Sequence, residues 1–356
     1  MLRKHRWAAL AAAGCMILAV SGCGKPQAPE PPAPVEETTA AAEIPAGRIF
    51  SMATNGDWTS SFKGKVLEKE LQELSSRTEG AVKIRLYDRS RLGDDVHLVS
   101  GVLSGTIDMM QSSPASQVSA VPEAAFFEVP GLFSSLEEWN ALLSGPYLQV
   151  MKGYYADAGL ELLDVFAWSW RELSSKIPVQ EPADLEGLRI RTIENPYQEA
   201  FWNSLGAVAV PYNYAELYFC LHEGIADAQE NLPDVILLDN LYELQSCVTF
   251  TRHLPVINAV SMRKELYESL SPQEKEALAW LTADLKEKLL EQMPEEEERL
   301  VETLDHDYGL EMLEPSEALT AKIREGSGLI LEMLRENLGD EKTDRFLEAV
   351  EAVKSE

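Results

Sequence analysis

Strand-like and helix-like patterns alternate from residue 48 onwards, and this alternation limits the chain to few folds. Residues 48–53 (RIFSMA) have the composition of a strand, and apolar residues recur at helical spacing over 62–80. Apolar and polar residues alternate over 82–87, residues 94–103 are helical, and 107–110 form a short buried strand. This succession predicts an α/β unit with a parallel sheet.

A second unit of the same kind follows residue 160. Its elements are a strand at 160–168, a strand at 188–192, a helix at 197–205, a short strand at 207–210, a helix at 214–221 and a strand at 225–229. About 310 residues follow position 46, which is large for one hydrophobic core and suits two lobes. We expect crossovers near residues 168 and 256. Lobe I then consists of 47–168 and 257–296, and lobe II of 169–256 and 297–356.

The two units predict a two-lobed fold like that of periplasmic binding proteins, in which each lobe is a sheet flanked by helices. Ligands of such sheets bind beyond the carboxyl ends of the strands, so the binding cleft should lie between the lobes.

One predicted helix is unusually long. Residues 271–274 (SPQE) form a capping box with proline at the first helical position. Leucines then recur at helical spacing as far as Leu304, which gives a helix of about 50 Å. Pro294 should kink this helix without ending it. A helix of this length can span both lobes.

Residues 1–22 have the features of an export signal. A basic start precedes an apolar run over 7–20, which is shorter than the about 20 residues that a bilayer requires. The run ends on Val20-Ser21-Gly22-Cys23, which resembles a bacterial lipobox. In that class of signals the cysteine is lipidated and becomes the mature N-terminus. An ordinary signal peptide with an incidental cysteine is the alternative.

Residues 23–46 are rich in proline, alanine and glutamate, and we expect a disordered tether. One acyl chain binds a membrane only marginally, so the lipobox implies more than one chain, palmitate among them, on Cys23. The two segments together predict a soluble domain that is anchored to the membrane outside the cytoplasm.

Composition excludes several classes of ligand and activity. The formal net charge of −28 argues against nucleic acid or anionic lipid as a ligand. No His/Cys/Asp cluster has metal-ligand spacing, and His222-Glu223 lacks the second histidine of a zinc-protease helix. No Gly-x-Ser-x-Gly motif of a hydrolase is present. We therefore expect no enzyme activity, no metal and no cofactor. Cys220 and Cys247 could form a disulfide or remain two separate buried thiols.

Several motifs in a fixed order carry a resemblance. They are SRLGDD at 90–95, GTIDM at 105–109, PADLEGLRIR at 182–191, Asn195-Pro196, LGA at 205–207, DAQEN at 227–231, and His253. In this order and spacing the chain resembles the solute-binding proteins of tripartite ATP-independent periplasmic (TRAP) transporters. The resemblance covers nearly all of residues 47–350. It implies a protein that closes on a small organic acid and delivers it to the membrane subunits of the transporter. A lipoprotein that presents its ligand to a membrane sensor kinase would have the same binding chemistry and is the alternative.

The arginines of "GLRIRT" at 187–192 suggest how a carboxylate could be bound. Arg189 and Arg191 lie two residues apart in a predicted strand and share one face. Arg191 is nearer the carboxyl end, where the cleft should lie, and its guanidinium has the geometry for bidentate carboxylate binding. In the family the second basic residue of this motif makes that contact, so the resemblance assigns it to Arg191. A structural salt bridge is the alternative for Arg191, and we expect Arg189 to face solvent.

The resemblance implies further ligand-binding positions, which are Arg171, Asn231, Tyr214, Asp95, Ser112 and Ser113. Arg171 could instead be a surface arginine, and Tyr214 could be a core aromatic residue. Relatives that bind sialic acid or related ligands have an asparagine near the position of Ala53 and a charged residue near Ser113, which this chain lacks. Their absence argues against such a polar ligand with many hydroxyl groups. The tryptophans Trp58, Trp168, Trp170 and Trp202 instead allow a more apolar cleft, with ordinary core positions as the alternative.

Overall fold

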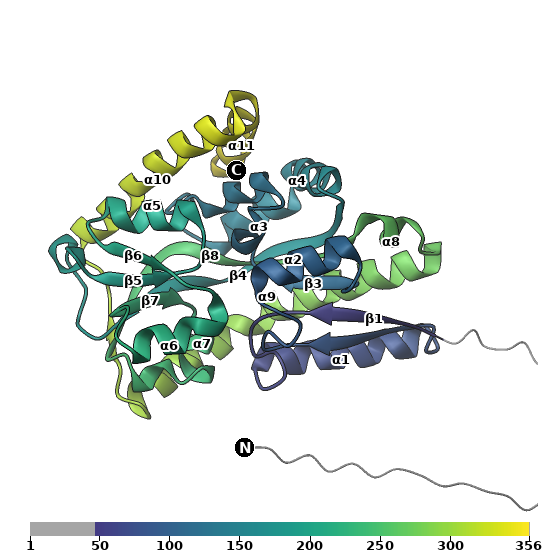
Figure 1. Cartoon of the computed structure of the whole chain (residues 1–356), viewed down its shortest axis with the longest axis horizontal. Helices are drawn as coiled ribbons and strands as arrows, with labels where there is room; N and C mark the ends of the chain where they lie inside the picture. The colour runs from purple at the N-terminus through teal and green to yellow at the C-terminus, as the bar shows by residue number, and fades with distance from the viewer. Residues whose placement is uncertain (1–46, 356) are drawn as a thin grey trace, which may run out of the picture. The chain divides into compact units, whose positions relative to one another are not determined.

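One mixed sheet runs through residues 47–355, the part of the chain that the structure, a computed structural model, describes (Figure 1). Its strands are β1 (Arg48–Ala53), β2 (Val82–Tyr87), β3 (Met109–Ser112), β4 (Leu160–Ser175), β5 (Arg189–Thr192), β6 (Val208–Pro211), β7 (Ala228–Asn231), β8 (Cys247–Arg263) and β9 (Glu311–Leu313). The helices are α1 (Phe62–Arg77), α2 (Asp95–Ser104), α3 (Leu136–Ser144), α4 (Pro146–Asp157), α5 (Pro196–Ser204), α6 (Leu217–His222), α7 (Pro233–Leu238), α8 (Lys264–Glu268), α9 (Pro272–His306), α10 (Glu317–Leu338) and α11 (Asp340–Lys354). Two short 3-10 helices, η1 (Pro114–Gln117) and η2 (Pro122–Glu128), follow β3.

The sheet has two parallel ends joined by two long antiparallel strands. Its strand order is β2-β1-β3-β8-β4-β7-β5-β6. β1 pairs in parallel with β2 and β3, and β5 pairs in parallel with β6 and β7. Between these ends β4 and β8 pair antiparallel along most of their length, and β9 adds to β8. We call the part built around β1, β2 and β3 the first lobe, and the part built around β5, β6 and β7 the second lobe.

The long strands make the sheet continuous from one lobe to the other. The sequence predicted a separate sheet for each lobe and a strand that ends at residue 168, but β4 continues to Ser175 and β8 runs for 17 residues. The register of β4 against β8 shifts between Ala167 and Ser169, next to the pair that Ser169 forms with Val256. The segments around residues 168 and 256 thus pair with each other, and the shift at Trp168 is one of three along these two strands.

Helices cover both faces of this sheet, as Figure 1 shows. Helices α3, α4, α5, α10 and α11 lie on one face, and α1, α6, α7 and α9 lie on the other. Consecutive strand residues contribute to opposite sides, because Met109 packs in one hydrophobic cluster and Met110 in the other. Each cluster contains residues of both lobes, so the hydrophobic core is not divided at the cleft.

Local capping explains where the first elements begin and end. The Ser61 hydroxyl accepts a hydrogen bond from the Gly64 amide at 3.0 Å and starts α1. Helix α2 ends at Gly105, whose φ of 78° lies in the left-handed region that glycine tolerates. The next strand therefore begins at Met109, two residues later than predicted, since the amide of Ile107 still bonds the Gly101 carbonyl.

Helix α9 has the predicted length and start. It runs for 35 residues, which is about 50 Å, and Ser271 and Glu274 form the expected capping box. It packs against α1 of the first lobe and α7 of the second lobe, and it continues through Pro294. The prediction of one helix that spans both lobes is confirmed.

Two other expectations changed or were resolved. The predicted helix over 214–221 divides into a 3-10 turn at Tyr214–Glu216 and the short α6. Cys220 and Cys247 are both buried, and each is a free thiol.

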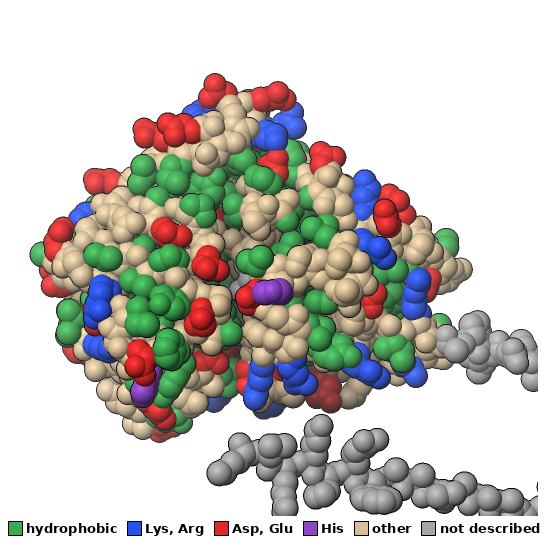
Figure 2. Space-filling model, viewed as in Figure 1, with side chains coloured by type: hydrophobic (Ala, Val, Ile, Leu, Met, Phe, Trp, Pro, Cys, Tyr) green, Lys and Arg blue, Asp and Glu red, His purple; other side chains and the backbone are tan. Residues whose placement is uncertain are grey.

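Acidic side chains are spread over the face of the molecule that Figure 2 shows, with lysines and arginines among them.

Candidate functional site

A cleft between the lobes gathers the carboxyl ends of strands from both of them. Its volume is about 130 Å³. It is lined by Thr54, Asn55, Gly56, Trp58, Lys63, Gln111, Ser112, Ser113, Ser116, Trp168, Arg171, Arg191, Ile193, Tyr214, Asn231, Leu232, Val235, Val256, Ile257 and Asn258. Residues that end or follow β1, β3, β5 and β7 are all present, as the rule for ligands of such sheets requires. The cleft therefore lies where the sequence placed it.

The two arginines of β5 differ as expected. Arg189 is exposed and binds the Asp227 carboxylate through Nε and Nη2, each at 2.8 Å. Arg191 is completely buried, lines the cleft, and donates from Nη2 to the Tyr212 carbonyl at 2.6 Å. A buried guanidinium beside a cleft is in a medium of low dielectric, where its attraction for an anion is strong. Arg191 can therefore bind a carboxylate that enters the cleft.

Arg171 also lines the cleft but has a protein partner. Its Nε and Nη2 donate to the carboxylate of Glu230, and Nη2 also donates to the Glu230 carbonyl at 2.8 Å. His253 Nε2 lies 3.2 Å from the same carboxylate, and the Thr251 hydroxyl forms a hydrogen bond with His253 Nδ1. Burial alone would raise the pKa of Glu230, but Arg171 and His253 lower it to about 2. Arg171 is thus held in place by an ionised, fully buried glutamate.

Asn231 and Tyr214 reach the cleft from the second lobe. The Asn231 amide nitrogen donates to the side chain of Gln229 at 3.0 Å. The Tyr214 hydroxyl donates to Asp239, and burial followed by that carboxylate raises the pKa of Tyr214 well above its usual value. Tyr214 is therefore a neutral, anchored ring in the wall of the cleft.

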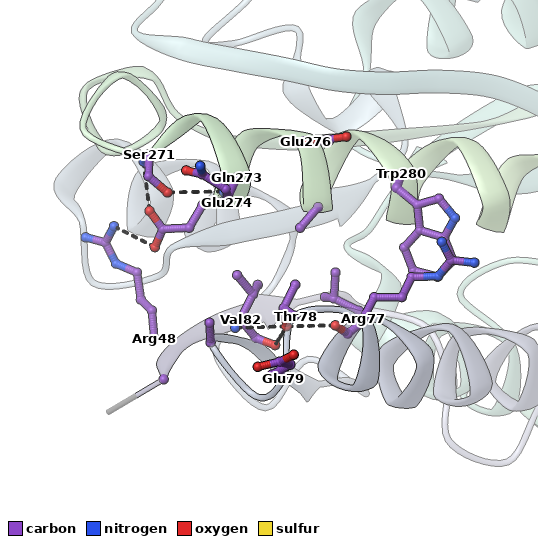
Figure 3. Close-up of a pocket in the computed structure, with 14 residues that line it drawn as sticks. Arg48, Arg77, Thr78, Glu79, Val82, Ser271, Gln273, Glu274, Glu276 and Trp280 are labelled. Carbon is purple, nitrogen blue, oxygen red and sulfur yellow. Dashed lines mark hydrogen bonds and ion pairs between the residues drawn. The ribbon is translucent and has the colours of Figure 1, made fainter. Parts of the chain in front are cut away.

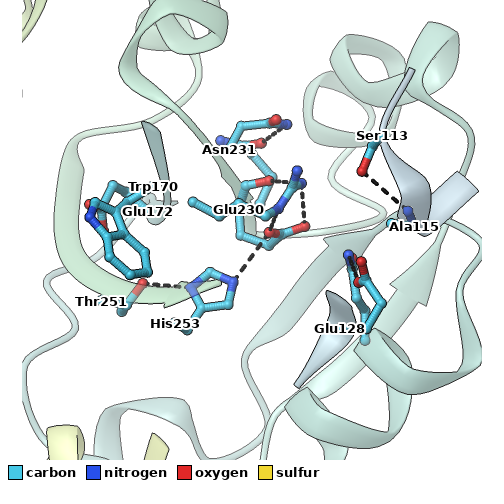
Figure 4. Close-up of polar contacts among 12 residues, drawn as sticks. Ser113, Ala115, Glu128, Trp170, Glu172, Glu230, Asn231, Thr251 and His253 are labelled. Carbon is cyan, nitrogen blue, oxygen red and sulfur yellow. Dashed lines mark hydrogen bonds and ion pairs between the residues drawn. The ribbon is translucent and has the colours of Figure 1, made fainter. Parts of the chain in front are cut away.

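The first-lobe serines lie where the resemblance placed them. The Ser112 hydroxyl accepts from Gln117 at 2.8 Å, and the Ser113 hydroxyl caps η1 by accepting from the Ala115 amide at 3.3 Å (Figure 4). Both serines line the cleft. Asp95 is the first residue of α2, and its side chain lies outside the described part of the structure.

The sequence reasoning missed a group of carboxamides on the first-lobe side. Asn55 follows β1, while Gln111 lies in β3 and Asn258 in β8, where the Gln111 amide donates to Asn258 at 2.7 Å. Within residues 47–355 neither polar atom of the Asn55 side chain has a hydrogen-bond partner, nor has Gln111 Oε1 or Asn258 Nδ2. Buried amides without partners are costly, so these atoms are suited to bind a polar ligand. The sequence does contain a signal for these residues, because they are polar side chains inside or just after apolar strands.

The expected apolar character is limited to part of the wall. Trp58 and Trp168 line the cleft, whereas Trp202 packs against Phe201 and His253 in the core. Asn55 stands two residues beyond Ala53. The cleft therefore has an asparagine close to the position where relatives that bind sialic acid have one. The expectation of a more apolar cleft must therefore be corrected to a mixed one, and the argument against a ligand with many hydroxyl groups no longer holds.

A larger hollow of about 770 Å³ lies elsewhere, between the end of α1, the starts of β1 and β2, and the first turns of α9 (Figure 3). Both of its arginines already have partners, because Arg48 lies 3.6 Å from Glu274 and the Arg77 guanidinium stacks over Trp280. It lies at the amino ends of the strands, away from the expected ligand-binding edge. Size alone does not make it the ligand site.

Among residues 47–355 no group of three or more His, Cys, Asp or Glu side chains could hold a metal ion. In the same range, no helix combines the length and hydrophobicity needed to cross a bilayer.

Comparisons with known proteins identify the family of the chain. The profile of a family described as bacterial extracellular solute-binding protein, family 7 (DctP) matches residues 55–336. Over 206 residues the chain is 33% identical to the 2,3-diketo-L-gulonate-binding periplasmic protein YiaO of Escherichia coli K12. That match covers 58% of this chain and 63% of the relative, which is less than two thirds of its length.

Two crystal structures have similar folds. One is the sugar acid binding protein DctPAm of Advenella mimigardefordensis in complex with galactonate, with a TM-score of 0.80, 24% identity, and coverage of 86% of this chain and 99% of that one. The other is a TRAP periplasmic solute binding protein of Haemophilus influenzae with bound L-gulonate, with a TM-score of 0.79, 20% identity, and coverage of 86% and 99%. These similarities confirm the two-lobed α/β fold. Because the family profile spans most of the described residues, the chain belongs to the bacterial extracellular solute-binding proteins of family 7.

Proposed function

We propose that this protein captures a small hydroxylated organic acid in the cleft between its lobes and delivers it to the membrane subunits of a TRAP transporter, without catalysing a reaction. The observation that carries the proposal is Arg191, a completely buried arginine at the carboxyl end of β5 that lines the cleft. Its guanidinium supplies the paired donors that a carboxylate accepts. Asn231 adds a donor and an acceptor on the same side.

The other assigned residues complete the proposed site. Arg171 is a second cation whose direction is fixed by Glu230, and Tyr214 forms a wall against the ligand. Ser112 and Ser113 offer hydroxyls, and Asp95 remains a ligand-binding position assigned by resemblance alone.

The carboxamides favour a ligand with hydroxyl groups. Asn55, Gln111 and Asn258 have unpartnered amide atoms, and hydroxyls both donate and accept hydrogen bonds. The structurally similar proteins bind galactonate and L-gulonate, and the Escherichia coli relative is named for 2,3-diketo-L-gulonate. A sugar acid satisfies both the arginine and the amides, so it is the ligand class that we propose.

The proposed cleft also implies a division of the chain into two lobes. Lobe I comprises 47–168 with 257–296, and lobe II comprises 169–256 with 297–356. The register of β4 against β8 shifts at Trp168, near these crossovers, as it also does at two other places along the pair. The C-terminal α11 packs on α3 and α4, which ties the end of the chain to the first lobe as well. Closure of the lobes around the acid would exclude water from Arg191.

For its location, we propose cleavage of a signal peptide at 1–22 and lipidation of Cys23, with residues 23–46 as the tether. These residues lie outside the described range, so the support is the lipobox-like sequence alone. Presentation of the ligand to a sensor kinase is the less favoured alternative, because the similar solved structures include TRAP solute-binding proteins. Copurification of the protein with transporter membrane subunits or with a kinase distinguishes the two.

A thermal-shift screen tests the ligand class. Mono- and dicarboxylic acids, with and without hydroxyl groups, are added to the purified protein. A ligand at about a hundredfold its dissociation constant adds roughly 2.7 kcal/mol to the free energy of unfolding. We expect the largest shift with a hydroxylated monocarboxylate. If only acids without hydroxyls, or none, shift the transition, the proposed ligand class is wrong.

A further inference from the structure

A buried ion pair connects the two lobes at the wall of the cleft. Lys63 lies in the first turn of α1, which follows β1, and Asp234 lies in the first turn of α7, which follows β7. The Lys63 ammonium is 3.1 Å from the Asp234 carboxylate, and each side chain is only 6% exposed. Figure 1 shows the start of α1 facing α7. The charges therefore come from different lobes and meet only when these helices are close together.

Two tryptophans enclose the ammonium on the ligand side. Lys63 Nζ lies 5.5 Å from the centre of the Trp58 ring and 5.2 Å from that of Trp168. These distances are within the range of cation–π attraction. Trp58, Lys63 and Trp168 all line the cleft. The position of the ammonium is thus fixed by one carboxylate and two aromatic faces.

This arrangement limits the charge that the cleft can accept next to Lys63. An ammonium has three N–H donors, of which Asp234 can take one, so donors remain for a neutral oxygen such as a hydroxyl. Asp234 does not itself line the cleft, but a second ligand carboxylate that bound the Lys63 ammonium would share it with the Asp234 carboxylate. Like charges at short range in a site with little water repel strongly. A hydroxyl group avoids this repulsion.

We propose that the Lys63–Asp234 pair determines specificity by rejecting acids with a second carboxylate, so that the ligand is a monocarboxylate with a neutral, hydroxylated far end. The inference rests on the proposed function, because it assumes that one carboxylate is bound in the same cleft. It makes Asp234 a specificity residue that acts through Lys63, since this carboxylate already neutralises the ammonium with which a second ligand carboxylate would pair.

Calorimetric titration of the full chain with matched acids tests the inference. The probes are erythronate, xylonate and galactonate, each compared with its dicarboxylic counterpart, meso-tartrate, xylarate and galactarate. We expect the wild type to bind at least one monocarboxylate about a hundredfold more tightly than its counterpart. Asp234→Asn should reduce that ratio at least tenfold, because the second carboxylate can then pair with Lys63.

Two further variants separate the charge effect from a loss of structure. The double variant Lys63→Gln/Asp234→Asn removes the cation as well and should restore the preference for the monocarboxylate. Asp164→Asn is the matched control, because Asp164 pairs with Lys286 at 3.6 Å, and neither residue lines the cleft. It should leave the ratio unchanged. Circular dichroism and thermal unfolding confirm that each variant is folded.

The outcomes are distinguishable. If the wild type binds none of the six acids, both the proposed function and this inference are wrong. If it binds a monocarboxylate but Asp234→Asn leaves the ratio within about twofold, or if the wild type binds the dicarboxylate equally well, only this inference is wrong.

Discussion

Arg191→Ala should be the most damaging single change to ligand binding. Arg191 is completely buried beside the cleft, so a carboxylate that binds it is removed from water together with the guanidinium. Truncation of one partner of such a pair costs about 2–5 kcal/mol, part of which comes from the unmatched charge that remains. The dissociation constant should therefore rise roughly 30-fold to several thousandfold. Arg191→Lys should recover little of this loss, because an ammonium lacks the paired donors of guanidinium.

Arg189→Ala is the matched control on the same strand. Arg189 is exposed and pairs with Asp227, and an exposed pair contributes little, so binding should change by less than about threefold. Calorimetric titration with the acid that gives the largest thermal shift compares the three variants at one salt concentration. Circular dichroism checks that each remains folded. If Arg189→Ala abolishes binding while Arg191→Ala has no effect, the ligand site is misplaced.

The remaining predictions concern stability, motion and location. Burial and the nearby Glu230 carboxylate raise the pKa of Glu128 to about 7. The Glu128 carboxyl therefore keeps its proton to a higher pH in the folded state than in the unfolded state. Glu128 alone should lower the free energy of unfolding by about 2–3 kcal/mol between pH 5 and 8, and Glu128→Gln should reduce the fall seen in denaturant titrations by that amount; an equal fall in both proteins contradicts it. In α10, Gly326→Ala should destabilise the fold, because its Cβ would lie 2.8 Å from a phenylalanine ring, whereas Gly328→Ala has open space and should stabilise it by about 1 kcal/mol. The order of the two melting temperatures is the test. Small-angle scattering should show a smaller radius of gyration with saturating acid, and no change would argue against closure. Cys23→Ala should release the protein from membranes or block its maturation, and equal retention in fractionation would contradict lipidation.

Hydrophobic periodicity was sufficient for the elements with strong local signals. Helices α1 and α9 and strands β1 and β2 lie where the spacing predicted them, since caps and apolar stripes are local properties. The full extent of β4 and β8 could not be predicted, because each strand is stabilised by pairing with residues 72 to 103 positions away. The late start of β3 depended on how α2 ends at Gly105.

The candidate site shows the same limit. Arg191 could be identified from a short motif and the alternation of a strand, and its burial agrees with that assignment. The cluster of Asn55, Gln111 and Asn258 could not be found from spacing, because the three residues come from separate strands and meet only in the folded sheet. Lys63 was overlooked because a lysine on the buried side of a helix is visible in sequence only when the packing of that helix is known.

The shared strands also have a consequence for how the chain folds after export. In the strand order, β8 lies between β3 and β4, and it also carries β9 at its other end. Neither lobe can complete its part of the sheet until residues 247–263 have emerged, so the chain before that point exposes unpaired strand edges. Long-range pairing of this kind slows folding and makes partly emerged chains prone to association. We therefore expect the lobes to acquire structure together, late and cooperatively, and a fragment that ends before residue 247 to be unable to fold as a separate domain.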